Sequence, residues 1–126
     1  MLDVMVVDDS ATIRAAIRMI LQHAGHRVRE AQSAEHALSS LEAGPAPELF
    51  ILDLNMPGMN GIELVRRLRA VQRHRFTPVL LLTTESGGEP RKLAKQAGAS
   101  GWIVKPVASA DLVRVIGQVC PKAHHP

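Results

Sequence analysis

The sequence predicts an α/β domain whose parallel sheet carries helices on both faces. Five short apolar runs alternate along the chain with five segments in which apolar residues recur at helical spacing. Continuous apolar runs are typical of strands that are buried on both faces, and alternation of strand and helix requires right-handed crossovers between parallel strands. The 126 residues, 46% hydrophobic and only 2% aromatic, suffice for one domain with an aliphatic core.

The first strand and helix are predicted from Val4 to Gly25. Val4–Val7 is a continuous apolar run that stops at acidic residues, and Ser10 or Asp9 can cap the helix that follows. Gly25 is expected to end this helix. The apolar residues of the helix keep helical spacing and leave Arg14 and Arg18 outside: Ile13, Ile17, Ile20, Leu21 and Ala24.

The second strand–helix unit is weaker in its pattern. Residues His26–Ala31 alternate only in part, which favours a strand near the edge of the sheet. Ser33 is expected to cap the next helix, and the segment Gly44–Pro47 stops it. Its apolar stripe is Ala34, Ala37, Leu38 and Leu41.

The third strand ends at an acid. The apolar run Leu49–Leu52 is followed by Asp53 and by the loop signal Pro57-Gly58, which indicates a buried strand that delivers Asp53 to the rim of the sheet. Asn60 or Gly61 opens a third helix. Its buried side is expected to comprise Ile62, Leu64, Val65, Leu68 and Val71.

Two further strand–helix units complete the predicted sheet. The run Val79–Leu82 ends at Thr83-Thr84, and a thin stripe of Leu93, Ala94 and Ala97 predicts a loosely held helix that Gly98 ends. Ser100–Val104 is the fifth strand, terminated by Lys105-Pro106. A closing helix, capped by Ser109, carries the apolar residues Leu112, Val115, Ile116 and Val119.

Polar side chains from separate parts of the sequence converge on one rim of the predicted sheet. The successive strand ends present Asp8 and Asp9, Asp53, Thr83, and Lys105. Ligands of open parallel sheets bind at the carboxyl ends of the strands. Like charges at about 4 Å repel by roughly 4 kcal/mol at an effective dielectric near 20, so clustered carboxylates favour a bound divalent cation.

The donor set favours Mg²⁺ and phosphoryl chemistry. A site with two or three protein oxygens, completed by water, suits Mg²⁺ better than Ca²⁺. Beside such an ion, Asp53 could act as a carboxylate nucleophile toward a phosphoryl group and form an acyl phosphate. Lys105 offers a positive charge and Thr83 a hydroxyl donor to the phosphoryl oxygens.

Several motifs together resemble the receiver domain of two-component response regulators, and most closely the CheY-type chemotaxis regulators. They stand in the family's order and spacing over nearly the whole chain. These motifs are Val6-Val7-Asp8-Asp9-Ser10, Asp53-Leu54-Asn55-Met56-Pro57-Gly58-Met59-Asn60-Gly61, Leu82-Thr83-Thr84-Glu85, and Ala97-Gly98-Ala99-Ser100-Gly101-Trp102-Ile103-Val104-Lys105-Pro106.

The resemblance implies a flavodoxin-like, doubly wound sheet of five strands in the order 2-1-3-4-5, with five helices. It implies that Asp53 is the phosphoacceptor, that Thr83 and Lys105 hold the phosphoryl group, and that Lys105-Pro106 is a candidate cis peptide. The implied Mg²⁺ ligands are Asp9, Asp53 and the backbone carbonyl of Asn55, with Asp8 acting largely through water.

The resemblance also implies a switch and a timer. Thr83 would move toward the phosphoryl oxygens, and Trp102, at a position where tyrosine or phenylalanine is more usual, would turn inward. A fixed, partly buried Trp102 that anchors the fourth helix is the alternative. Asn55 and Glu85 occupy the positions that tune how long the phosphate lasts. Thr84 and Val107 depart from the residues common in the family.

The implied function is that of a single-domain response regulator. A CheA-like histidine kinase would phosphorylate it, and the phosphorylated protein would bind a target such as a flagellar motor switch component. It would not be an enzyme beyond assisting its own phosphorylation and dephosphorylation. Two alternatives stay open, namely a phosphorelay carrier or phosphate sink, and a haloacid-dehalogenase-like phosphatase, which would want an acid where Asn55 stands.

Composition limits the other possibilities. The single cysteine, Cys120, and an N-terminus without a signal-peptide pattern favour a cytoplasmic protein without membrane insertion. The net charge of +3 is mild. We expect a monomeric receiver domain over residues 1–120 with a disordered tail at 121–126.

The basic and imidazole side chains are predicted to lie at the surface. The chain lacks interleaved aromatic residues and a helix-turn-helix segment, so we expect no nucleic-acid binding. The arginine-rich segment is read as a solvated helix face, and the histidines as surface residues. These residues are Arg66, Arg67, Arg69, Arg73 and Arg75, and His23, His26, His36, His74, His124 and His125.

Overall fold

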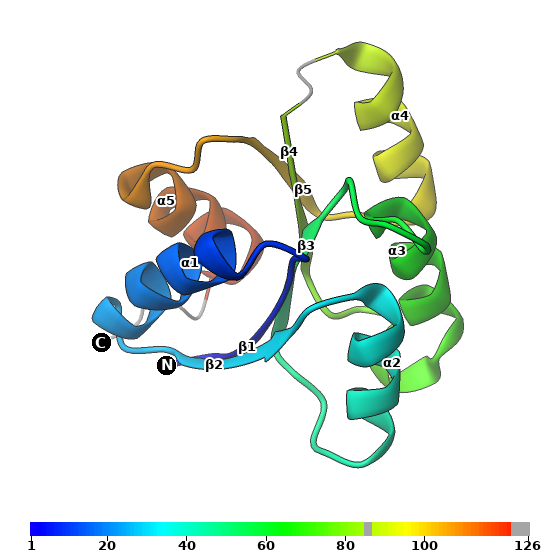
Figure 1. The fold of residues 1–126 in the computed structure, drawn as a ribbon, viewed down its shortest axis with the longest axis horizontal. Helices are drawn as coiled ribbons and strands as arrows, with labels where there is room; N and C mark the ends of the chain where they lie inside the picture. Colours follow the sequence, from blue (N-terminus) through cyan, green and yellow to red (C-terminus); the bar gives the residue numbers. More distant parts are fainter. Residues whose placement is uncertain (85–86, 122–126) are drawn as a thin grey trace.

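Five parallel strands form the centre of the molecule in the computed structural model, which describes residues 1–84 and 87–121 (Figure 1). The strand order is β2-β1-β3-β4-β5, which confirms the flavodoxin-like order expected from the sequence. The elements are β1 (Asp3–Val7), α1 (Ala11–His23), β2 (Arg27–Ala31), α2 (Ala34–Glu42), β3 (Leu49–Asp53), α3 (Gly61–Ala70), the 3₁₀ turn η1 (Gln72–His74), β4 (Val79–Thr83), α4 (Gly88–Ala97), β5 (Gly101–Val104) and α5 (Ser109–Val119).

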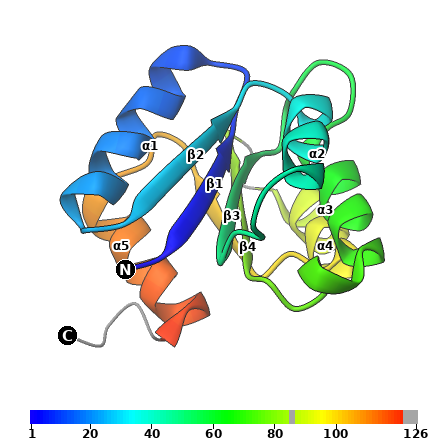
Figure 2. The ribbon, with the colours of Figure 1, turned by 90° about the horizontal axis from the view of Figure 1, so that it is seen from below.

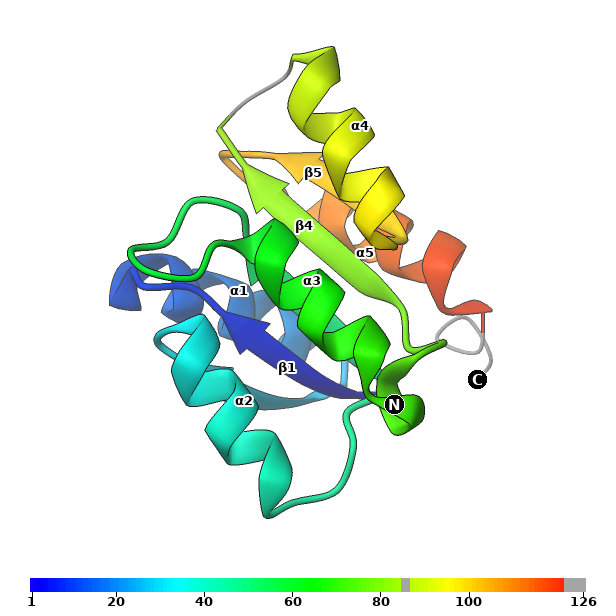
Figure 3. The same ribbon diagram turned by 90° about the vertical axis from the view of Figure 1, so that its right-hand side faces the viewer.

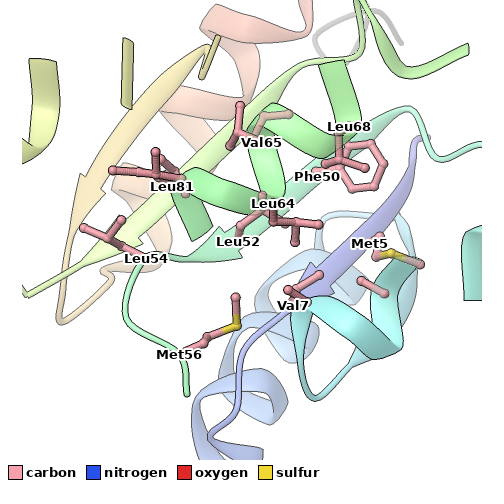
Figure 4. Packing of buried hydrophobic residues seen from close by; sticks show 14 of the residues in the cluster. Met5, Val7, Phe50, Leu52, Leu54, Met56, Leu64, Val65, Leu68 and Leu81 are labelled. Carbon is pink, nitrogen blue, oxygen red and sulfur yellow. The ribbon is translucent and has the colours of Figure 1, made fainter. Parts of the chain in front are cut away.

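The helices cover both faces of the sheet. Helices α1 and α5 lie on one face, and α2, α3 and α4 lie on the other (Figures 1 and 2). Alternate residues of each central strand therefore enter two separate apolar clusters, as the period of a strand requires. Figure 4 shows the larger cluster, in which Phe50, Leu52 and Leu81 pack beneath Leu64, Val65 and Leu68 of α3.

Side-chain caps begin three of the helices, as the sequence predicts. The hydroxyl of Ser10 accepts a hydrogen bond from the N–H of Ile13 (3.3 Å), and that of Ser33 accepts one from His36 (3.0 Å). The Asn60 side chain accepts the N–H of Glu63 at 2.9 Å. These bonds satisfy amide donors of the first turn and fix where each helix starts.

Two predictions about helix ends are wrong. Ser109 is the first residue of α5 rather than its cap; the cap position is Ala108, which has no side-chain acceptor. Val71 does not lie on the buried side of α3, because the helix ends at Ala70 and Val71 adopts an extended conformation with 41% of its surface exposed. Both errors arise where a helix begins or ends, which the spacing of apolar residues does not resolve.

The prediction that the histidines are surface residues is wrong for His74. Its side chain is buried, and its ring meets the ring of Phe50 edge-on with centroids 5.5 Å apart. Burial, followed by the charges of Arg73, Arg29 and Arg69, lowers the pKa of His74. The short η1 turn places the residue against β3, a tertiary contact that sequence periodicity does not indicate. His124 and His125 lie outside the described residues.

The arginines of α3 and η1 are not simply a solvated helix face. Arg69 donates two hydrogen bonds to the carbonyl of Gly98 (3.1 and 2.9 Å) and one to that of His74 (2.6 Å). Arg73 donates to the carbonyls of Leu41 and Gly44. These two guanidinium groups therefore tie α3 and η1 to the C-terminal ends of α4 and α2, which Figure 3 shows beside α3.

Helices of membrane-spanning length and hydrophobicity are not found in the described residues.

Candidate functional site

The polar residues predicted at the rim of the sheet come together at the carboxyl ends of four strands. Asp8 follows β1, Asp53 and Thr83 are the last residues of β3 and β4, and Lys105 follows β5. The strand register pairs Val7 with Leu52, Asp53 with Leu82 and Thr83 with Val104, so the four strands end at nearly the same level. The apolar runs thus determine where these side chains lie.

Lys105 joins the two buried acids of this site. Its ammonium nitrogen Nζ lies 3.0 Å from Asp53 Oδ1 and 3.3 Å from Asp8 Oδ2. The side chains of Asp8 and Asp53 are 1% and 5% exposed, and that of Lys105 is 13% exposed. A single positive charge therefore faces two carboxylates that are largely removed from water, so the pair is not fully neutralised by Lys105.

Backbone groups hold the same carboxylates. The N–H of Ser10 donates to Asp8 Oδ1 at 2.9 Å, and the N–H of Asn55 donates to Asp53 Oδ1 at 3.4 Å. The N–H of Lys105 donates to the carbonyl of buried Thr83 at 2.7 Å. The strand ends and the loops that follow them are consequently linked to one another around the acids.

A third acid completes a cluster that could hold a metal ion. Carboxylate oxygens of Asp8, Asp9 and Asp53 all lie within 4.8 Å of one another. Asp9 is exposed, so the cluster opens to water on one side. Carboxylate oxygens with room for water are the donors that Mg²⁺ prefers, and the residues present fit that ion.

Burial and neighbouring charges shift the pKa values of Asp53 and Lys105. Burial raises the pKa of Asp53, and the charge of Asp8 adds to the effect; the hydrogen bond and charge of Lys105 oppose both without cancelling them. Burial lowers the pKa of Lys105, but the hydrogen bond to Asp53 and the charges of both acids outweigh burial and leave the pKa raised. Burial is the main cause of the Asp53 shift, while neighbouring negative charge contributes to both shifts, and a cation would offset that charge.

We expect the Asp53 carboxyl group to titrate above the ordinary range of an aspartate when Mg²⁺ is absent. Mg²⁺ should lower that pKa, because the ion favours the ionised form. Asp8→Asn should also lower it, whereas Lys105→Met should raise it further. Carboxyl-carbon NMR across a pH titration measures each effect, and a metal-free Asp53 that titrates below the ordinary range would contradict the expectation.

Three further residues predicted to belong to the site are described by the structure: Asn55, Pro106 and Trp102. Asn55 is exposed in the loop after β3, and the Lys105–Pro106 peptide bond is cis. Trp102 is partly buried against the cluster that includes Leu81 and Ala94. The guanidinium of Arg91 lies 5.8 Å from the centre of its ring, and its indole Nε1 is buried with no hydrogen-bond partner among the described residues. Glu85 lies outside the described residues.

Sequence reasoning missed Arg14, which was expected simply to lie on the outer side of its helix. Its Nη1 donates a hydrogen bond to the carbonyl of Asp8 at 2.6 Å, and its Nε lies 3.3 Å from Glu30 Oε1. The one available signal was that Arg14 lies near the start of α1, the helix that follows the acid pair. That position does not indicate which oxygen the side chain reaches, because no sequence pattern indicates a bond to a main-chain carbonyl.

Comparison with known proteins identifies relatives over almost the full length. The family model described as response regulator receiver domain matches residues 4–117. Chemotaxis protein CheY1 of Helicobacter pylori (strain J99) is 40% identical over 103 residues, which cover 81% of this chain and 83% of that protein.

Solved structures agree with these matches. The structure of Vibrio cholerae chemotaxis protein CheY4 has a TM-score of 0.89 and 38% identity, covering 94% of this chain and 98% of the other. The receiver domain of the sensor histidine kinase PA1611 from Pseudomonas aeruginosa has a TM-score of 0.84 and 25% identity, over 93% of this chain and 95% of that one. That structure contains a magnesium ion coordinated in its active-site cleft.

Proposed function

Because this chain belongs to the response regulator receiver domain family, we propose that its acid cluster is a Mg²⁺-dependent phosphoacceptor site with Asp53 as the acceptor. The observation that carries the proposal is the contact of Lys105 Nζ with both Asp53 (3.0 Å) and Asp8 (3.3 Å), beside the oxygens of Asp9. Residues 1–120 would form the receiver domain.

The residues of the site divide the work of phosphoryl transfer. Asp8, Asp9, Asp53 and the Asn55 carbonyl would hold Mg²⁺, which when bound supplies positive charge next to the incoming phosphoryl oxygens. An Asp53 carboxylate oxygen attacks phosphorus of a phosphohistidine, the phosphorus–nitrogen bond breaks, and the histidine leaves with the electron pair. Lys105 then pairs with the phosphoryl oxygens, as it pairs with the carboxylates in the structure.

The same site is suited to work as a switch. Phosphorylation adds negative charge and strong acceptor oxygens beside Thr83, whose hydroxyl can donate to them. Thr83 lies two residues after Leu81 on β4, and Trp102 lies opposite Leu81 on the neighbouring strand β5. The side chains of all three therefore face the side of the sheet whose apolar cluster includes Ala94 of α4. A shift of Thr83 would therefore change the space available to the indole ring.

Phosphorylation should alter the fluorescence of Trp102, the one tryptophan in the sequence. Addition of beryllofluoride with Mg²⁺, a phosphoryl mimic, should shift the emission because the ring changes its surroundings. The measurement is an emission spectrum before and after addition, and Asp53→Asn treated in the same way is the control. A spectrum that stays unchanged would rule out inward rotation and leave Trp102 as a fixed anchor of α4.

The signalling role follows from the relatives. The chain is similar to two proteins named for chemotaxis, so we propose a cytoplasmic, CheY-like regulator that a histidine kinase phosphorylates and whose phosphorylated form binds a motility target. Asn55 and Glu85 would set how long the phosphate lasts.

Partner capture in the presence and absence of beryllofluoride tests the signalling role. A target retained only by the activated protein supports a regulator with its own output. Rapid return of phosphate from Asp53 to a histidine of another protein, without such a target, would instead indicate a phosphorelay carrier.

A further inference from the structure

We propose that Arg14 is a positioning residue that fixes the Asp8–Asp9 peptide and thereby sets the geometry of the Mg²⁺ ligands. The inference rests on the proposed function of the acid cluster. It assigns a role to a side chain that donates to the main-chain oxygen between two acids and that is not among the residues proposed to hold the phosphoryl group.

Arg14 links three elements beside the site. From α1 it donates to the carbonyl of Asp8 at the end of β1 (2.6 Å) and pairs with Glu30 on β2 (3.3 Å). Figure 2 shows β2 and β1 side by side in the sheet, with α1 next to them on one face. The Arg14 side chain is only 17% exposed, so water competes little for these bonds.

The backbone of Asp8 is held from both sides. Its N–H donates to the carbonyl of Ala31 at 3.2 Å, and its carbonyl accepts the bond from Arg14. The carbonyl belongs to the peptide that joins Asp8 to Asp9. A bond to this oxygen therefore limits rotation of that peptide and the direction in which the Asp9 side chain leaves the chain.

Asp9 depends on this restraint more than the other acids do. The side chain of Asp8 is held by Ser10 and Lys105, and that of Asp53 by Asn55 and Lys105. Asp9 is exposed, and within residues 1–84 and 87–121 no hydrogen bond or ion pair holds its carboxylate. Its place in the cluster is thus set by the main chain, which Arg14 fixes.

Glu30 in turn orients Arg14 and provides a matched comparison. Its second oxygen lies 2.7 Å from Arg18 Nη1, one helical turn beyond Arg14. The hydrogen bond from Arg18, together with the charges and bond of Arg14, lowers the pKa of Glu30 against the opposing effect of burial. Arg18 shares the helix, the charge and the Glu30 partner of Arg14, but donates no hydrogen bond to Asp8 in the described structure.

If Arg14 acts only through its charge, replacing it should raise the Mg²⁺ affinity; if it acts by positioning Asp9, replacing it should lower that affinity. A positive charge near the cluster repels Mg²⁺, so loss of the Arg14 charge alone would tighten binding slightly. Loss of the hydrogen bond to the Asp8 carbonyl would instead leave Asp9 free to turn away and would weaken binding. Outer partners of metal ligands commonly change affinity by about 10- to 100-fold.

The test compares the Mg²⁺ affinity of the full chain and its variants by titration calorimetry. We expect Arg14→Gln to weaken binding by about tenfold. Arg14→Lys should also weaken it, because an ammonium group lacks the fork that reaches Asp8 and Glu30 together. Arg18→Gln should leave the affinity unchanged or slightly higher. Amide NMR adds a second readout, in which the Asp9 signal of Arg14→Gln should move or broaden before any metal is added.

The outcomes separate this inference from the proposed function. If the unaltered chain binds no Mg²⁺, or if Asp9→Asn binds it equally well, the metal site itself is wrong. If both behave as proposed but Arg14→Gln binds as Arg18→Gln does, or binds more tightly, Arg14 acts through charge alone and the inference is overturned. Thermal unfolding of each variant shows whether it is folded. If Arg14→Gln does not fold, the comparison of Arg14→Lys with Arg18→Gln tests the inference instead.

Discussion

Asp53→Asn is expected to lower phosphoryl incorporation on the order of 100-fold or more while the fold remains intact. An amide oxygen is a poor nucleophile, and the change also removes one of the negative charges expected to bind Mg²⁺. Incubation with a small acyl phosphate and Mg²⁺, followed by intact-protein mass spectrometry, measures the effect. The unaltered chain should gain one phosphoryl group.

The control for this substitution is an acid away from the site. Asp111→Asn removes a carboxylate of α5 whose side chain is 60% exposed and paired only loosely with Arg114, at 3.6 Å. It should be phosphorylated as well as the unaltered chain. Equal incorporation into Asp53→Asn would show that another residue accepts the phosphate.

Asp53→Asn should also stabilise the metal-free protein. Because burial and Asp8 raise the pKa of Asp53 in the folded state, its ionisation costs stability as the pH rises through the ordinary aspartate range. Asparagine fills nearly the same space without the charge. An unfolding midpoint that rises for Asp53→Asn in Mg²⁺-free buffer, and does not rise when Mg²⁺ is present in excess, would match this reasoning.

The strands and the main acids of the site could be predicted because one pattern determines both. An apolar run such as Leu49–Leu52 must be buried, and the first charged residue after it, Asp53, must then lie at the rim of the sheet. The same logic places Asp8, Thr83 and Lys105. The resemblance to a family added the strand order, which apolar patterns alone do not determine.

The contacts that sequence reasoning missed depend on main-chain acceptors and on loops. Arg14 donates to the carbonyl of Asp8, directly after β1, and Arg69 donates to the carbonyl of Gly98, which is far from it in the sequence. A carbonyl is present in every residue, so the sequence does not indicate which one an arginine will reach. His74 is similar, since its burial against Phe50 depends on how η1 turns after α3.

Gly61 links the stability of the fold to the position of the proposed acceptor. As the first residue of α3, it donates its N–H to the carbonyl of Leu54 at 2.9 Å and lies directly against the end of β3. A Cβ at this position would come within 2.5 Å of the Asp53 carbonyl oxygen and within 2.9 Å of both Leu54 Cα and a Leu81 methyl group. Two of these three neighbours are main-chain atoms, which cannot turn away as a flexible side chain can.

Gly61→Ala is therefore expected to lower the free energy of unfolding by about 1–3 kcal/mol, the usual cost of forcing extra volume into a packed site. Relief of the clash requires β3 and α3 to separate, which would displace Asp53 from Lys105 and slow phosphorylation. Denaturant unfolding and the mass-spectrometric assay measure the two effects. Gly88→Ala is the matched control: Gly88 is also the first residue of its helix, but a Cβ there meets nothing within 4 Å. Equal stability of the two variants would contradict the close packing of α3 against the acceptor strand.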